Sequence, residues 1–321
     1  MEEALRVCPK GCLFLAGHQF CAWHGEPVVP LVDHTVGKFK ITEGLPSPAT
    51  FRALYQACHI HQEDLVVNLE LIKPPHCYNV EIVENFLEAV ETVARVRRPQ
   101  IPEVLQYAKL PWPHAAILLP PGSPQQGRLE PGIDPDKALE GIASALSSIH
   151  KAGLVHRNLK PTNILVDNRM GKSPEERVCL VDWMIATRID VDQGGIPRNP
   201  SPVLAKVGDP QYMAPEQFNG EFGTTSDVYQ FGLLAFELLT GENPFSALPP
   251  QQATLATWRH LHEHQAPRKL QQVDNRIPAS LGKVIARCLQ KRPDKRYKDG
   301  GELLEAIKNH DLPFHKRLFK K

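Results

Sequence analysis

The hydrophobic pattern of this chain changes once, at the Pro/Gly-rich stretch PPGSPQQGRLEPG of residues 120–132. Before it, residues 36–118 contain short segments rich in β-branched and aromatic residues, which are typical of strands: KFKITEGL, FRALYQAC, DLVVNLELI, VLQYAKL and AAILL. Among them, ENFLEAVETVARVRR places four apolar side chains on one face of a helix: Phe86, Val90, Val93 and Val96. After the change the chain turns helical. Strands followed by helices predict an α+β fold of two lobes.

The carboxy-terminal part is expected to consist mainly of helices. DPDKALEGIASALSSIHKAG begins at Asp134, which suits an N-cap, and ends at Gly153, which suits the C′ position. TTSDVYQFGLLAFELLTGENPF is apolar nearly all round, so we expect that helix to be buried. Further helices are predicted in ATLATWRHLHEH, PASLGKVIARCLQ and GELLEAIKNH. The basic residues 313–321 are predicted to form a solvated tail.

Composition excludes several classes of protein. A formal net charge of +1 creates no overall field toward nucleic acid or a membrane surface. No apolar run approaches the ~20 residues of a membrane span, and MEEALRVCPK lacks the basic start and apolar core of a signal peptide. Of the seven cysteines, some are scattered, which suits a reducing compartment better than a disulfide framework: Cys58, Cys77, Cys179 and Cys288. We therefore expect a cytoplasmic protein that binds no nucleic acid.

The second half carries a series of recognisable stretches in a fixed order. They are HRNLKPTN, LVDWM, VGDPQYMAPE, SDVYQFGLLAFELLTGENPF and RPDKRY. With a strand-rich lobe ahead of a helical lobe, they resemble a protein kinase of the bacterial Ser/Thr type over residues 36–312. The resemblance implies a bilobal protein-kinase-like fold, with an amino-terminal lobe at 36–118 and a carboxy-terminal lobe at 122–312.

The resemblance carries over to some residues of the nucleotide site. It implies that Asn163 and Asp182 hold Mg²⁺ and that Lys160 neutralises the γ-phosphate of ATP. Asn158, however, stands where the family has the carboxylate that orients the substrate hydroxyl and accepts its proton. An amide can orient the hydroxyl, but it cannot take the proton at any working pH.

Two structural ties of the family are expected to persist. The resemblance implies that Glu216 pairs with Arg296, near the end of the lobe. It also implies that Asp227, on the buried helix, accepts hydrogen bonds from the backbone of His156 and Arg157. For both acids the alternative is a solvated surface carboxylate.

The third predicted strand departs from the family. Its V-A-I-K motif aligns with residues 67–70, so that Glu70 replaces the lysine that grips the phosphates and Asn68 replaces the alanine over the adenine. Unit charges ~4 Å apart interact by about 4 kcal/mol at an effective dielectric near 20, so we expect Glu70 to repel the triphosphate. A competing register makes Lys73 the phosphate lysine. It would turn every side chain of the strand to the other face.

The helix and the phosphate-covering loop also differ from the family. The helix position that should carry a glutamate is Ala89, and a helix turns about 100° per residue, so neither Glu88 nor Glu91 takes its place. The loop EGLPSPATFRALY has one glycine and two prolines where the family has three glycines. Arg52 stands near the last glycine position.

Further changes lie around the activation segment. Asp209 replaces the threonine before the YMAPE stretch, and it can pair with Lys160 or serve as a base displaced from Asn158. The DFG-like triplet is Asp-Trp-Met, starting at Asp182, and Trp can fill the aromatic slot. Ser201, in TRIDVDQGGIPRNPSPVLAKV, is a candidate for phosphorylation.

Residues 1–30 carry a separate pattern, C-x3-C-x8-C-x2-H, formed by Cys8, Cys12, Cys21 and His24. Four such ligands close a tetrahedral Zn²⁺ site, which supplies folding energy and no chemistry. FCAWHGEPV resembles the second knuckle of a zinc ribbon, and Gly11 and Gly25 allow tight turns. The alternatives are a metal-free tether and a redox role. We expect His18 to be a loop residue.

These observations favour a pseudokinase: a non-catalytic regulatory or scaffold module in protein phosphorylation signalling, with a protein partner such as a kinase or phosphatase. The alternative is a weak or atypical ATP-dependent Ser/Thr kinase that keeps Mg-ATP through Asn163 and Asp182, with Arg52 or Lys73 in place of the missing lysine. Positioning and electrostatics carry most of phosphoryl transfer, so the loss of a base need not abolish it.

Overall fold

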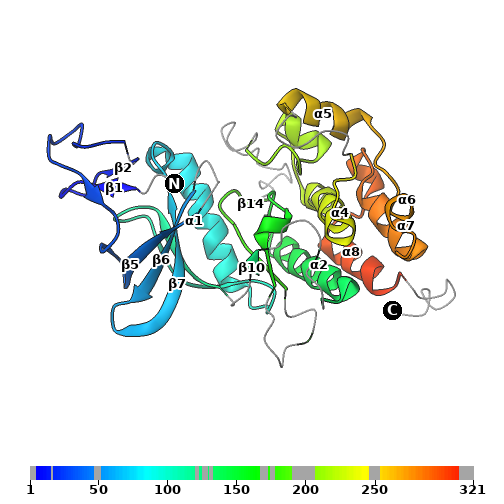
Figure 1. The fold of residues 1–321 in the computed structure, drawn as a ribbon, viewed down its shortest axis with the longest axis horizontal. Coiled ribbons are helices and arrows are strands. Elements are labelled where there is room, and N and C mark those ends of the chain that lie inside the picture. Colours follow the sequence, from blue (N-terminus) through cyan, green and yellow to red (C-terminus); the bar gives the residue numbers. More distant parts are fainter. Residues whose placement is uncertain are drawn as a thin grey trace, which may run out of the picture. The chain divides into compact units, whose positions relative to one another are not determined.

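The computed structural model describes residues 5–15, 17–46, 52–119, 123–124, 129, 133–166, 173, 178–189, 207–245 and 254–310. The chain forms two compact units: an amino-terminal unit of Met1–Arg97 and Pro102–Leu119, and a carboxy-terminal unit of Arg98–Ile101 and Pro120–Lys321. Ser201, most of the activation segment, the tip of the phosphate-covering loop and the tail at 313–321 lie outside the described residues. The first unit is built on a sheet and the second on helices, which confirms the α+β prediction (Figure 1).

The amino-terminal unit contains an antiparallel six-stranded sheet of order β4-β5-β6-β7-β9-β8. Its strands are β4 (Thr35–Val36), β5 (Phe39–Leu45), β6 (Arg52–His59), β7 (Gln62–Ile72), β8 (Glu103–Ala108) and β9 (His114–Leu118). A small second sheet of order β2-β1-β3 is made by β1 (Arg6–Val7), β2 (Leu13–Phe14) and β3 (Val29–Pro30). The segments predicted as strands are therefore strands.

The helix of this unit, α1 (Val80–Arg95), packs against β8. It starts at Asn79, whose side chain accepts a hydrogen bond from the Ile82 N–H and so caps the first turn. The predicted apolar face is buried at Phe86, Val90 and Val93. Val96 is the C-cap and only half-buried, because the helix ends one residue before it.

The two sheets of the amino-terminal unit share one hydrophobic core. Apolar residues of the first 31 pack with inward-facing residues of the six-stranded sheet and with Trp112, between β8 and β9; the core includes Leu5, Leu13, Leu31, Ile41, Tyr55 and Leu69. The Tyr55 hydroxyl also accepts a hydrogen bond of 2.8 Å from the Leu5 N–H. The cysteine-containing segment is therefore packed into the lobe that follows it in sequence.

The carboxy-terminal unit is organised around two buried helices. They are α2 (Pro135–Lys151) and α4 (Thr224–Thr240), accompanied by α5 (Leu255–His264), α6 (Leu270–Val273), α7 (Ala279–Cys288) and α8 (Gly300–Lys308). The capping predictions for α2 are confirmed: Asp134 accepts from two backbone N–H groups, and Gly153 has φ +77°. α4 is buried nearly all round, as predicted. The short α6 was not predicted.

α8 lies directly against α2, and a glycine permits the approach. A Cβ on Gly300 would lie 2.4 Å from the backbone nitrogen of Ser147, closer than van der Waals contact allows. The short strands β11 (Leu154–Val155), β12 (Ile164–Val166), β13 (Val178–Leu180) and β14 (Thr187–Arg188) complete this unit, with β10 (Ser123–Pro124) beside β12. No helix of the described residues combines the length and apolarity that crossing a bilayer requires.

Candidate functional site

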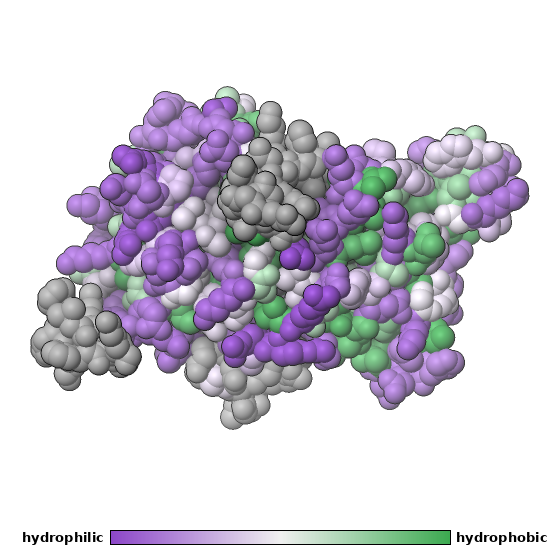
Figure 2. Space-filling model, turned by 180° about the vertical axis from the view of Figure 1, so that it is seen from behind, coloured by the Kyte–Doolittle hydropathy of each residue, from purple (hydrophilic) through white to green (hydrophobic). Residues whose placement is uncertain are grey.

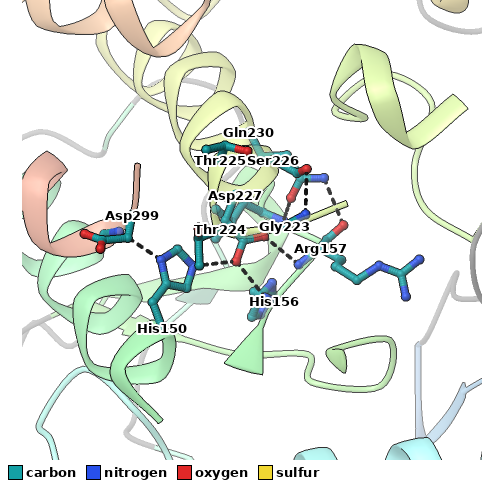
Figure 3. A network of polar contacts seen from close by, with 12 residues as sticks. His150, His156, Arg157, Gly223, Thr224, Thr225, Ser226, Asp227, Gln230 and Asp299 are labelled. Carbon is teal, nitrogen blue, oxygen red and sulfur yellow. Dashed lines mark hydrogen bonds and ion pairs between the residues drawn. The ribbon is translucent and has the colours of Figure 1, made fainter. Parts of the chain in front are cut away.

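The loop HRNLKPTN connects β11 to β12 in the carboxy-terminal unit and is anchored by Asp227 of α4. The His156 and Arg157 N–H groups donate to the two carboxylate oxygens of Asp227, each at 2.7 Å (Figure 3). Asp227 is fully buried, so these bonds satisfy a carboxylate that water does not reach. The predicted tie is confirmed, and the surface-carboxylate alternative is wrong.

Two residues that the sequence did not single out complete this anchor. His150 Nε2 lies 2.9 Å from Asp227 Oδ2, while its Nδ1 accepts from the Gly300 N–H at 2.8 Å, so the proton of the neutral ring belongs on Nε2. Gln230 donates to the Arg157 carbonyl at 2.9 Å and accepts from the Leu159 N–H at 3.1 Å. Both sides of the loop backbone are thereby fixed to α4 (Figure 3).

Asp182, which follows β13, meets the loop residues Asn158 and Asn163, so the predicted metal ligands and the base position lie together. Asn158 Nδ2 donates to Asp182 Oδ2 at 3.0 Å, and Asn163 Nδ2 donates to the Asn158 carbonyl at 2.7 Å. Asn163 and Asp182 are each 3% exposed. The amide of Asn158 must present its NH₂ group to Asp182, because its carbonyl oxygen would repel the carboxylate. An amide therefore bonds to one of the oxygens with which Asp182 would hold a metal ion.

The aromatic residue after Asp182 fixes the same region. Trp183 is fully buried, and its ring meets that of His156 edge to face at 4.6 Å. Burial lowers the pKa of His156, so this ring is neutral near pH 7. Its Nε2 lies 3.1 Å from the Val181 carbonyl, and its Nδ1 accepts from the Asn158 N–H at 3.2 Å. Tryptophan thus occupies a packed aromatic position here.

Two ion pairs predicted in this unit are present. Lys160 Nζ lies 3.2 Å from Asp209 Oδ2, and Asp209 Oδ1 accepts from the Gln211 N–H, so both carboxylate oxygens are bonded. This favours the structural interpretation of Asp209 over a displaced base. Glu216 and the buried Arg296 form a two-pronged pair at 2.6 and 2.9 Å, a geometry that fixes direction as well as distance.

The amino-terminal unit places Glu70 on β7 and Arg52 on β6. Arg52 Nη1 lies 3.0 Å from Glu70 Oε1, and the two side chains are 11% and 6% exposed. In the ladder Glu70 is opposite Leu54, two residues from Arg52, so the pair is a diagonal contact on one face of the sheet. Glu70 is therefore not the uncompensated negative charge that the sequence led us to expect, because Arg52 offsets it.

Lys73, the lysine of the competing register, lies just beyond the end of β7. Asn68 shares the face of Glu70, whereas Lys73 follows Ile72, the last residue of β7. Ala89 of α1 is fully buried and carries no charge. Glu88 is exposed, and Glu91 pairs with Arg95 on its own helix.

The cysteine pattern forms a compact cluster in the same unit. Each of four residues contributes one ligand atom, and these atoms lie within 4.8 Å of one another: Cys8, Cys12, Cys21 and His24. His18 is exposed and is not a member of the cluster.

Comparisons with known proteins agree with this architecture. The protein kinase domain matches residues 129–312. The chain belongs to the protein kinase family. It is 29% identical over 288 residues to serine/threonine-protein kinase Pkn1 of Myxococcus xanthus, covering 87% of this chain and 39% of that protein. It is 32% identical over 184 residues to PknB of Mycolicibacterium smegmatis, covering 56% of this chain and 27% of that protein.

This kinase-family chain thus spans well under half the length of these curated relatives. Its fold is similar to the crystal structure of the Mycobacterium tuberculosis PknI kinase domain. The TM-score is 0.60 at 21% sequence identity, over 87% of this chain and 98% of that one. The bilobal protein-kinase-like fold predicted from the sequence is therefore confirmed.

Proposed function

We propose that this member of the protein kinase family is a non-catalytic regulatory or scaffold module in protein phosphorylation signalling. The observation that carries the proposal is the hydrogen bond from Asn158 to Asp182. Asn158 places an amide where the family has its proton acceptor. It also engages an oxygen of the carboxylate on which Mg²⁺ binding depends.

The energetic consequence of this bond can be bounded. A hydrogen bond to a charged group contributes about 1.5–3 kcal/mol, so a metal ion that needs the same oxygen must offset that amount. The Lys160 ammonium, which the family directs to the γ-phosphate, is already paired with Asp209. Both features of the carboxy-terminal unit weaken Mg-ATP binding.

The amino-terminal unit supports the same conclusion. A buried ion pair between Arg52 and Glu70 leaves little net charge on the sheet face where the family carries its phosphate-binding lysine. By contrast, Asp227 and Arg296, which hold the carboxy-terminal unit together, keep their partners. The residues that stabilise the fold are therefore kept, whereas those that bind ATP in the family are changed. This pattern is expected of a module that acts through its surface.

A protein is the partner that we propose. Figure 2 shows one face of the molecule, where green apolar patches lie among purple hydrophilic side chains. Large apolar side chains of the amino-terminal unit are more than half exposed at Phe20, Trp23, Tyr78 and Val80. Aromatic side chains are enriched at the centres of protein interfaces, and a net charge of +1 does not favour nucleic acid. An active kinase or a phosphatase is the class of partner that suits a regulator of this fold.

We expect wild-type protein to show no metal-dependent rise in melting temperature with up to about 5 mM Mg-ATP, since a ligand stabilises the folded state only where its concentration exceeds its dissociation constant. Differential scanning fluorimetry with Mg-ATP, ATP alone and Mg²⁺ alone measures this. The matched control is Asp182→Ala, which should respond as the wild type does. A rise that needs both metal and nucleotide and disappears in Asp182→Ala would contradict the proposal.

One observation favours a second candidate, a weak or atypical ATP-dependent kinase. Asn158 is hydrogen-bonded to both Asn163 and Asp182, which keeps the two predicted metal ligands close together. In the amino-terminal unit, Glu70 holds the Arg52 guanidinium on one face of the six-stranded sheet. If this kinase acted through Mg-ATP, the effect of the protein on a co-purified kinase or phosphatase would be lost in Asp182→Ala. The regulatory proposal expects that effect to be the same in both proteins.

Replacing Asn158 with Asp should make the stability of the protein depend on Mg²⁺. The change removes a donor from Asp182 and places two carboxylates about 3 Å apart, so we expect a loss of about 1–3 kcal/mol without metal. Mg²⁺ should restore it by binding between the carboxylates. Urea unfolding with EDTA and with Mg²⁺ measures the difference. Asn158→Ala removes the donor and frees the Asp182 oxygen without adding a charge, so it should show a smaller Mg²⁺ response than Asn158→Asp; an equal response in both variants would sink the prediction.

A further inference from the structure

We propose that Cys8, Cys12, Cys21 and His24 bind one Zn²⁺ in a closed, structural site, and that this site fixes the start of α1 to the amino-terminal sheet. The ligand atoms lie within 4.8 Å of one another. Three thiolates and an imidazole form a set that zinc prefers in closed sites. The proposal stands whether or not the protein binds ATP.

The distances within the cluster match a shared central ion. Nδ1 of His24 lies 3.7, 3.5 and 3.3 Å from the sulfur atoms of Cys8, Cys12 and Cys21. With Zn–S about 2.3 Å and Zn–N about 2.0 Å at the tetrahedral angle, a sulfur and a nitrogen ligand should be about 3.5 Å apart. One ring nitrogen has a single hydrogen or a single lone pair, so a hydrogen bond explains at most one of these contacts.

Two tight turns present the ligands. In the first, the Gly11 N–H donates to the Cys8 carbonyl at 2.8 Å, and the Cys12 N–H donates to Cys8 Sγ at 3.3 Å. In the second, the Gly25 N–H donates to the Cys21 carbonyl at 2.8 Å. Gly11 and Gly25 have φ of +84° and +66°, a region that side chains disfavour. A backbone N–H directed at a sulfur atom stabilises its thiolate form, which is the form that binds metal.

The surroundings suit a structural ion and leave no place for a substrate. Cys8 and Cys21 are buried with Phe14 and Val28 in a small apolar cluster. Four protein ligands complete the tetrahedron, whereas a catalytic zinc keeps an open position. His24 is the exposed ligand, so it can be changed without disturbing the apolar packing.

Direct bonds connect the cluster to the rest of the unit. The Trp112 indole, between β8 and β9, donates to the Gly11 carbonyl at 2.8 Å. The Tyr78 hydroxyl donates to the Leu13 carbonyl at 3.0 Å, and its ring lies edge-on to that of Trp23 at 5.8 Å. Tyr78 immediately precedes Asn79, the N-cap of α1. Zinc that fixes the two turns therefore also fixes the Gly11 and Leu13 carbonyls, which accept the hydrogen bonds from Trp112 and Tyr78.

The test measures zinc in reduced protein purified without chelators, by elemental analysis and by native mass spectrometry. We expect one zinc per chain in the wild type and in Cys58→Ser, a matched control in which a half-buried cysteine outside the cluster is changed. His24→Ala and Cys21→Ser should lose most of it. Less than about a tenth of an equivalent in the wild type, with no uptake from added Zn²⁺, would overturn the proposal; so would full zinc content in Cys21→Ser.

A second readout tests the connection to α1 and guards against variants that fold poorly. Hydrogen exchange at the amides of residues 78–84 should become at least about tenfold faster in His24→Ala than in Cys58→Ser, and His24→Cys should restore both the zinc and the protection. Cobalt added to the apo wild type should give the absorption bands of tetrahedral thiolate coordination, which are absent in Cys21→Ser. Zinc loss with unchanged exchange at residues 78–84 would overturn the connection to α1.

Discussion

Replacing Asp227 with Ala is expected to lower the free energy of unfolding of the carboxy-terminal unit by about 3–6 kcal/mol. The carboxylate accepts from three buried donors, at His156, Arg157 and His150. Each buried donor left without an acceptor costs about 1–3 kcal/mol. Because whole domains are stable by only about 5–15 kcal/mol, this one change should bring the unit close to unfolding at 37 °C.

Urea unfolding with hydrogen exchange at the His156 and Arg157 amides measures this effect where it arises. Glu221→Ala is the matched control, since Glu221 is an exposed acid near the start of the same helix and should change stability by no more than about 0.5 kcal/mol. Asp227→Asn keeps one acceptor oxygen and should lie between the two. If Asp227→Ala behaved like Glu221→Ala, the loop would be held by other contacts, and Asp227 would not be its anchor.

The sequence predicted these carboxy-terminal contacts because short motifs carry them. Asp227 and Glu216 lie in stretches whose residues and order are recognisable without coordinates, and their partners were named correctly. His150 was missed because a basic residue near a helix end is usually explained by the helix dipole alone. Gln230 was missed because a glutamine on an apolar helix gives no signal until the loop that it contacts is in place.

The amino-terminal unit was harder to predict, since its contacts depend on strand register and on long sequence separations. Glu70 was assigned to its position, but the compensating Arg52 becomes apparent only when β6 and β7 are paired. Likewise, the sequence indicated a compact cysteine segment but not its packing into the sheet, where Trp112 bonds across 101 residues to Gly11. Non-local contacts of this kind leave no periodic pattern in the sequence from which they could be predicted.

The buried pair of Arg52 and Glu70 supplies the other prediction with a large effect. Removing one partner takes an ion-pair contact away from a charge in a nearly buried site, so Glu70→Leu and Arg52→Met alone should each lower the free energy of unfolding of the amino-terminal unit by about 3–5 kcal/mol. The double variant replaces the pair with apolar side chains of similar volume and should lie within about 1 kcal/mol of the wild type. Urea unfolding of the four proteins gives the coupling energy directly.

The exposed pair of Arg97 and Glu103 in the same unit is the matched control. Its side chains are 72% and 51% exposed, so the same cycle there should give a coupling energy below about 1 kcal/mol. A similarly small value for Arg52 and Glu70 would show that their charges are well solvated and available to a ligand.

The double variant also separates the two functional candidates, because it removes the cation that an atypical kinase would need for the phosphates while it preserves the fold. Unchanged regulation of a partner by the double variant follows from the non-catalytic proposal; its loss, with stability retained, would assign Arg52 to phosphate binding.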